Sequence, residues 1–164
     1  MLTFFKDIKY DLHILEAMAN NRKDGIDTVN ENLNQIILHL CKIAIYDDSR
    51  DRSVQVDGWE TEILNWLDLI DYKCNNLKKQ NRLKLKDYLL CLNDDLGRDD
   101  LVFRSVRRAK KLMKTDKVTK PNISELRKIL WEILEFQFKA MARGGWDDDI
   151  LLKNPSYKII RDRK

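Results

Sequence analysis

The fold is decided by the stretch NISELRKILWEILEFQFKAM, residues 122–141. Its apolar side chains recur every three or four residues, so they fall on one face of an α-helix. Asn122 and Glu125 have the spacing of a capping box at a helix start, and Gly144 and Gly145 stop the pattern. The stretch therefore predicts a long amphipathic helix with an apolar face made of Leu126, Ile129, Leu130, Ile133, Leu134, Phe138 and Met141.

The remainder of the chain repeats this helical pattern. Strand signals, such as alternating Val, Ile, Thr or Tyr with Asn-Gly turns, are absent. Further helices are predicted over 4–21, from Thr28, from Asp57, over 83–96 and from Asp99–Asp100. The predicted breaks lie near 22–27, 47–57, 97–99, 115–122 and 144–146. We predict an all-α protein, a single compact bundle of about six amphipathic helices plus a short C-terminal helical turn near 147–152. One domain is expected over 1–155 and a basic C-terminal tail over 156–164.

The composition favours a folded cytoplasmic protein. Hydrophobic residues make up 43% of the 164 residues and charged residues 35%, which suits helices with much exposed surface. Cys41, Cys74 and Cys91 form no C-x-x-C pair, so we expect unpaired thiols rather than disulfides or a zinc site. The first residues lack the features of a signal peptide, and no apolar stretch approaches the ~20 residues of a membrane span. No membrane partner is expected.

The net charge of +4 hides a strong asymmetry along the chain. Residues 1–72 carry 7 basic and 14 acidic side chains, whereas residues 73–120 carry 15 and 6. Residues 121–164 carry 9 and 7. Such asymmetry indicates either a basic binding face or attraction between two parts of the same chain.

The basic residues of the middle segment are periodic. A helix beginning near Asp100 buries Val102, Val106, Ala109 and Met113, which places a basic stripe on the opposite side. This stripe is predicted to be exposed and comprises Arg104, Arg107, Arg108, Lys111 and Lys114. It is a solvated helix face, a face for an acidic protein partner, or a nucleic-acid-binding face.

A helix-turn-helix would be the most specific nucleic-acid interpretation, with 89–96 as first helix and 100–111 as recognition helix. Asn93 stands where a small residue usually lets the two helices approach. Asp99 and Asp100 lie at the helix end that meets bases and phosphates, where carboxylates repel DNA. Both features favour an acidic protein over DNA as the partner.

Sequence patterns for catalysis are missing. His13 and His39 lie beside apolar stripes and are interpreted as helical histidines with satisfied hydrogen bonds. There is no Gly-rich phosphate loop, nucleophile elbow, H-E-x-x-H zinc motif or Glu-x-x-His di-iron pair. The acidic run 147–149 fits the first turn of a helix better than a cation site. We therefore expect no enzyme, no metal and no cofactor.

One further residue is a candidate for binding. Trp146 follows two glycines and lies close to Arg143, so it fits an exposed hot spot of a protein interface, although core packing suits it equally well. The best-supported hypothesis is a small cytoplasmic protein-binding module of the regulator, inhibitor, antitoxin or immunity-protein type. The alternatives are a nucleic-acid-binding protein that uses the basic helix 100–114, and an enzyme without a recognisable motif.

Overall fold

The fold is all-α, as predicted. The computed structural model describes residues 23–76, 101–142 and 148–162. These residues contain no β-strand, only an isolated antiparallel bridge between Tyr46 and Val118. The helices of the described residues are α2 (Lys23–Ile45), α3 (Arg52–Asn76), α6 (Leu101–Met113), α7 (Ile123–Ala142), α8 (Asp148–Lys153) and α9 (Pro155–Arg161).

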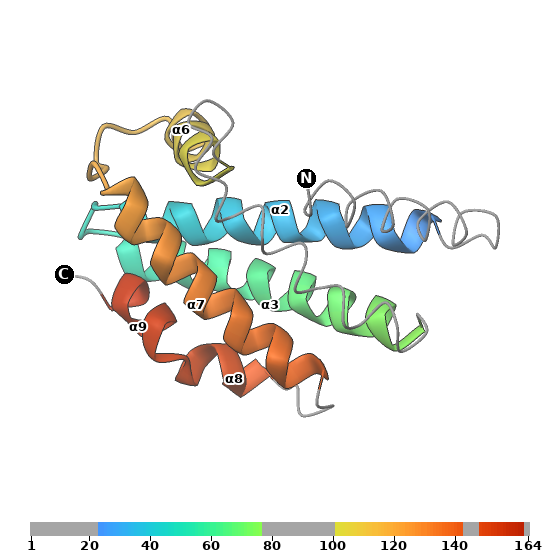
Figure 1. Cartoon of the computed structure of the whole chain (residues 1–164). Coiled ribbons are helices and arrows are strands. Elements are labelled where there is room, and N and C mark those ends of the chain that lie inside the picture. The colour runs from blue at the N-terminus through green and yellow to red at the C-terminus, as the bar shows by residue number, and fades with distance from the viewer. Residues whose placement is uncertain (1–22, 77–100, 143–147, 163–164) are drawn as a thin grey trace.

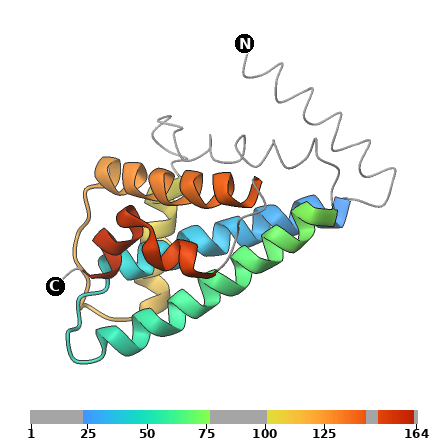
Figure 2. The same ribbon diagram turned by 90° about the horizontal axis from the view of Figure 1, so that it is seen from below.

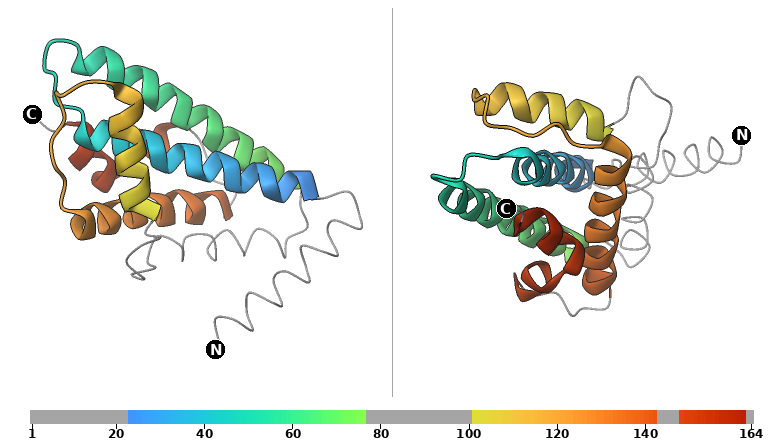
Figure 3. Two further views of the ribbon diagram at one scale, coloured as in Figure 1. Left: turned by 90° about the horizontal axis from the view of Figure 1, so that it is seen from above. Right: turned by 90° about the vertical axis from the view of Figure 1, so that its left-hand side faces the viewer.

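Helix α2 is the central element of the bundle. It contacts α3, α6, α7 and α9 (Figure 1), and the end-on view in Figure 3 shows these helices around it. From Ile36 to Tyr46 every side chain of this segment except Lys42 is buried. A helix that is apolar on nearly all sides belongs at the centre of a fold.

Helix α6 lies across α2, on the side away from α9 (Figures 1 and 3). Its buried residues are Val102, Ser105, Val106 and Ala109. The connection from α6 to α7 is fixed to the end of α2 by backbone hydrogen bonds, from Asp47 N to Lys117 O (2.8 Å) and from Thr119 N to Ile45 O (2.8 Å). The C-terminal end of α6 is thus held close to α2, and within the described residues the side chains on its outer face are exposed.

Two predicted helix starts differ from the structure. Helix α2 begins at Lys23 rather than at Thr28, and α3 begins at Arg52 rather than at Asp57. In α3 the extra turn places Val56 in the core, where it is 3% exposed, and this burial outweighs the local capping signal at Asp57. The predicted start of α7 is confirmed, because Asn122 Oδ1 accepts a hydrogen bond from Glu125 N (3.1 Å).

The C-terminal residues also differ from the prediction. The short helical turn is confirmed as α8, but 155–161 form helix α9 where a basic tail was expected. Asn154 caps α9 by accepting hydrogen bonds from Ser156 N and Tyr157 N, and Pro155 occupies the first turn. Helix α9 lies beside α7 (Figure 2), and its Tyr157 and Ile160 are buried. The burial of these two side chains favours folding of the segment.

Several predictions fall outside the described residues. They are the helices at 4–21 and 83–96, the breaks at 97–99 and 144–146, the state of Cys91, and Trp146. The side chain of Cys74 is likewise not described, whereas Cys41 is a buried free thiol whose pKa is raised to about 12 by burial. Among the described helices, none is long and apolar enough to cross a membrane.

Candidate functional site

The outer side of α6 carries the predicted stripe of cations. All five side chains are exposed, in agreement with the sequence prediction, and we refer to them as the basic face: Arg104, Arg107, Arg108, Lys111 and Lys114. Helix α6 contains no Asp or Glu, and the nearest acidic residues in the sequence are Asp100, before Leu101, and Asp116, after Lys114. None of the ion pairs in the described part of the chain involves the five cations. Among the described residues, the basic face is therefore a concentration of positive charge outside any ion pair.

The basic face ends at a sharp change of backbone direction. Lys114 has φ of 51°, the left-handed conformation that terminates many helices and that glycine usually occupies. This conformation turns the chain at Thr115 and directs it back toward the end of α2. The last cation of the face thus lies directly beside the loop that follows α6.

Two exposed apolar side chains flank the cations. Phe103 is 43% exposed and Leu112 is 49% exposed. The Arg107 guanidinium carbon lies 6.0 Å from the centre of the Phe103 ring, a cation–π distance that holds the arginine over the ring. The surface of α6 therefore combines positive charge with apolar patches at both ends.

A pocket of about 430 Å³ opens where α6, the end of α2 and the start of α3 meet. Tyr46 and Trp59 form an aromatic corner, with ring centres 5.3 Å apart and planes at 84°. Lys42 Nζ lies 5.8 Å from the centre of the Trp59 ring. The pocket is lined by Lys42, Tyr46, Asp51, Gln55, Trp59, Leu112, Met113 and Thr115.

The pocket and the basic face are electrostatically connected through Lys42. Burial lowers the pKa of this half-buried lysine, and the positive charge of Arg108 lowers it further, against the opposing effect of Glu62. Lys42 and Arg108 are therefore close enough to repel each other. A negatively charged group bound between them would relieve this repulsion.

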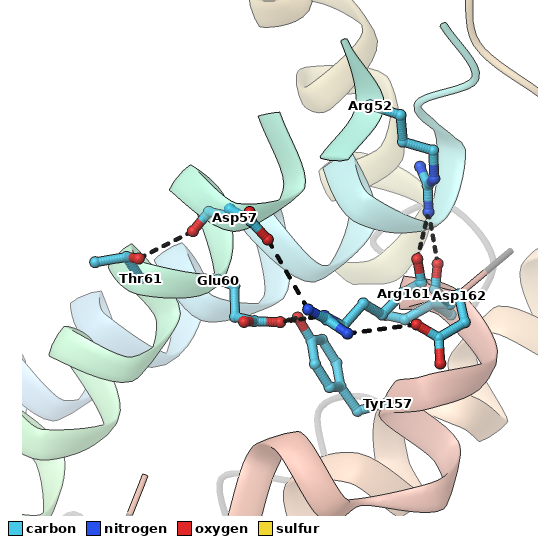
Figure 4. A network of polar contacts seen from close by, with 8 residues as sticks. Arg52, Asp57, Glu60, Thr61, Tyr157, Arg161 and Asp162 are labelled. Atoms are coloured by element: carbon cyan, nitrogen blue, oxygen red, sulfur yellow. Dashed lines mark hydrogen bonds and ion pairs between the residues drawn. The ribbon is translucent and has the colours of Figure 1, made fainter. Parts of the chain in front are cut away.

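A second polar site lies at the same end of α2, around Arg52 (Figure 4). Its guanidinium donates to Ile43 O (3.0 Å) and Tyr46 O (2.5 Å) at the end of α2. The same group donates to Ile160 O (2.8 Å) and Arg161 O (3.2 Å) at the end of α9. Because carbonyls at helix C-termini lack partners within the helix, one arginine here caps two helices.

Glu60 completes this network from α3. Its carboxylate accepts a hydrogen bond from the Tyr157 hydroxyl and pairs with Arg161 Nε (2.7 Å), as Figure 4 shows. Burial and this hydrogen bond raise the pKa of Tyr157. A pocket of about 370 Å³ adjoins the network and is lined by Arg52, Asp57, Arg161 and Asp162 among others. Its charges are already paired with one another, so we interpret the network as a structural connection between α3 and α9.

His39 has the structural role that the sequence predicted. Its Nδ1 lies 2.9 Å from Gln35 O, its Nε2 lies 2.5 Å from Glu62 Oε2, and its ring meets Trp66 edge-on at 4.6 Å. Burial lowers the pKa of His39. Within the described residues no group of three or more His, Cys, Asp or Glu side chains is arranged to hold a metal ion.

Sequence reasoning missed the pocket and the Arg52 network. Lys42 and Trp59 lie in helices that are distant in sequence from Leu112, so no local spacing could join them. Arg52 lies within the predicted break at 47–57, although an arginine directly before an apolar helix is compatible with a capping role. The basic face was found because helical periodicity alone separates its exposed and buried sides.

Comparison of the chain with protein-family models, with curated proteins and with solved structures gives no significant match.

Proposed function

We propose that this chain is a small protein-binding module without chemistry of its own, and that it binds an acidic protein through the basic face of α6. Regulators, inhibitors, antitoxins and immunity proteins work through such surfaces, and we place the chain among them by analogy of architecture alone. The observation that carries the proposal is the set of five exposed cations, four on α6 and Lys114 directly after it, on a helix without any acidic side chain.

The basic face is under electrostatic repulsion in the free protein. Arg104 is one turn from both Arg107 and Arg108, and Lys111 is one turn from the same two arginines. Like charges at these spacings destabilise a helix by about 0.2–0.5 kcal/mol for each pair. An acidic partner replaces the repulsion with attraction, so complex formation stabilises α6 as well as the interface.

An acidic protein suits this surface better than DNA. Asp99 and Asp100 directly precede α6 in the sequence, at the end where a recognition helix would approach the bases. A protein can place carboxylates along the cations and apolar side chains against Phe103 and Leu112, which a phosphate backbone cannot do. For these reasons we propose an acidic protein as the partner. Binding of nucleic acid is an alternative result that the experiment below distinguishes.

The proposal is tested by charge reversal with a matched control. One variant carries Arg104→Glu, Arg108→Glu and Lys111→Glu on the basic face. The control carries Lys128→Glu, Lys153→Glu and Lys158→Glu, three exposed lysines on α7, α8 and α9, so both variants have the same net charge. Labelled polyglutamate is the probe, and its affinity is measured by fluorescence anisotropy as the salt concentration is raised.

We expect the α6 reversal to weaken polyglutamate binding about tenfold or more and to flatten its salt dependence, while the control changes both much less. Urea denaturation should show that both variants fold, because exposed charges each contribute under about 1 kcal/mol to stability. Equal weakening in the two variants would show that only net charge matters and would overturn the proposal. Tighter binding of duplex DNA than of polyglutamate, lost on the α6 reversal, would establish the nucleic-acid interpretation instead.

A further inference from the structure

We infer that the pocket between Trp59 and Leu112 receives an aromatic side chain of the acidic partner and so determines which acidic proteins bind. This inference rests on the proposed function, since it assigns the pocket to the same partner that contacts the basic face. It adds a specificity element to a surface that would otherwise recognise charge alone.

The walls of the pocket suit a flat apolar group. The Trp59 ring is half-buried and held edge-on against Tyr46, which is 7% exposed and therefore fixed in the core. Leu112 and the half-buried Met113 face this corner from α6. A bound ring would gain contacts with the aromatic corner and with the flexible sulfur-containing side chain of Met113. Exposed Leu112 would lose contact with water when the ring is bound.

The polar groups at the pocket suit a phenolic side chain. Asp51 lines the pocket and accepts a hydrogen bond from the Tyr46 hydroxyl (2.5 Å), and Lys42 lines it as well, so both signs of charge are present. The Gln55 side-chain amide and the Thr115 hydroxyl can bond to a phenolic oxygen. Tyrosine therefore fits the pocket, because its ring can pack in the aromatic corner while its hydroxyl bonds to these polar groups.

The pocket adjoins the C-terminal end of the basic face. Leu112 and Met113 directly follow Lys111, and Lys114 stands between Met113 and Thr115. Lys42, inside the pocket, is within electrostatic reach of Arg108 on the face. In an acidic segment bound along α6, the residue that follows the carboxylates can therefore reach the pocket opening. Carboxylates on either side of an aromatic residue would then lie close to cations of this protein.

The experiment compares two labelled probes: a polyglutamate peptide with one central tyrosine, and the same peptide with alanine at that position. Each is titrated with the wild-type protein, with Leu112→Ala, and with Val54→Ala as control. Val54 is 71% exposed on α3 and does not line the pocket, so its substitution removes an exposed apolar side chain elsewhere. The fluorescence of Trp59, measured against a Trp59→Phe variant, reports occupancy of the pocket independently.

We expect the tyrosine peptide to bind the wild type about tenfold more tightly than the alanine peptide, because buried aromatic anchors dominate protein interfaces. Leu112→Ala should lower the affinity for the tyrosine peptide much more than the affinity for the alanine peptide and so remove most of this difference, and Val54→Ala should change neither affinity. Equal affinity of the two peptides for the wild type, with both still sensitive to charge reversal on α6, would overturn the inference and leave the proposed function intact. Insensitivity of both peptides to that reversal would overturn the proposed function itself.

Discussion

At the scale of single residues, Arg52 joins parts of the chain that are 108 and 109 residues apart in the sequence. Its planar guanidinium reaches the carbonyl ends of α2 and α9 together, which a single lysine ammonium cannot do with the same geometry. Hydrogen bonds from a charged donor are stronger than those between neutral groups, and the negative ends of two helix dipoles reinforce them. This residue therefore holds the C-terminal helix in place.

Replacing Arg52 by methionine should lower the free energy of unfolding by about 2–3 kcal/mol, because it leaves the carbonyls of two helix ends without their donor. Lysine at this position should recover part of the loss. The measurement is urea denaturation followed by circular dichroism. Arg50→Met is the matched control, since Arg50 is exposed and pairs with Asp48 alone, and it should leave stability nearly unchanged. A loss for Arg52→Met no larger than that of the control would refute the capping role.

At the scale of helices, periodicity predicted the elements better than their ends. The cap at Asn122 was correct, and so were the apolar stripes of α6 and α7, except that Met113 and Ile129 are half-buried. At the start of α3 they disagree, and burial of Val56 extends the helix past the local signal at Asp57. Helix α9 was missed because a segment of seven residues with two buried side chains is too short to show a helical period.

The extended start of α3 leaves Gly58 inside a helix. A Cβ placed there meets no atom within 4 Å, and the position is exposed. Gly58→Ala should therefore raise the free energy of unfolding by about 0.5–1 kcal/mol, because alanine loses less backbone entropy in a helix. Thermal or urea denaturation measures the gain, and polyglutamate affinity should stay the same because Gly58 is exposed and does not line the pocket. A less stable Gly58→Ala variant would contradict the helical assignment at this position.

At the scale of the whole molecule, the charge asymmetry of the sequence becomes a surface with one strongly basic helix. In the described part of the chain, the cations of the basic face form no ion pairs with the acidic residues of α2 and α3. The sequence predicted this face because charge and periodicity are local properties. It could not predict the adjoining pocket, because three helices must pack before Trp59 and Leu112 share a wall. We therefore propose that the acidic partner binds where α6 meets the end of α2 and the start of α3.

The most direct test of this central claim is a nuclear magnetic resonance titration of the ¹⁵N-labelled protein with the tyrosine-containing polyglutamate peptide. The account predicts that the largest shifts fall on the amides of 103–115 and on the indole N–H of Trp59, because these groups form the basic face and its pocket. Shifts concentrated on α7, α8 and α9, with the resonances of α6 unchanged, would contradict it.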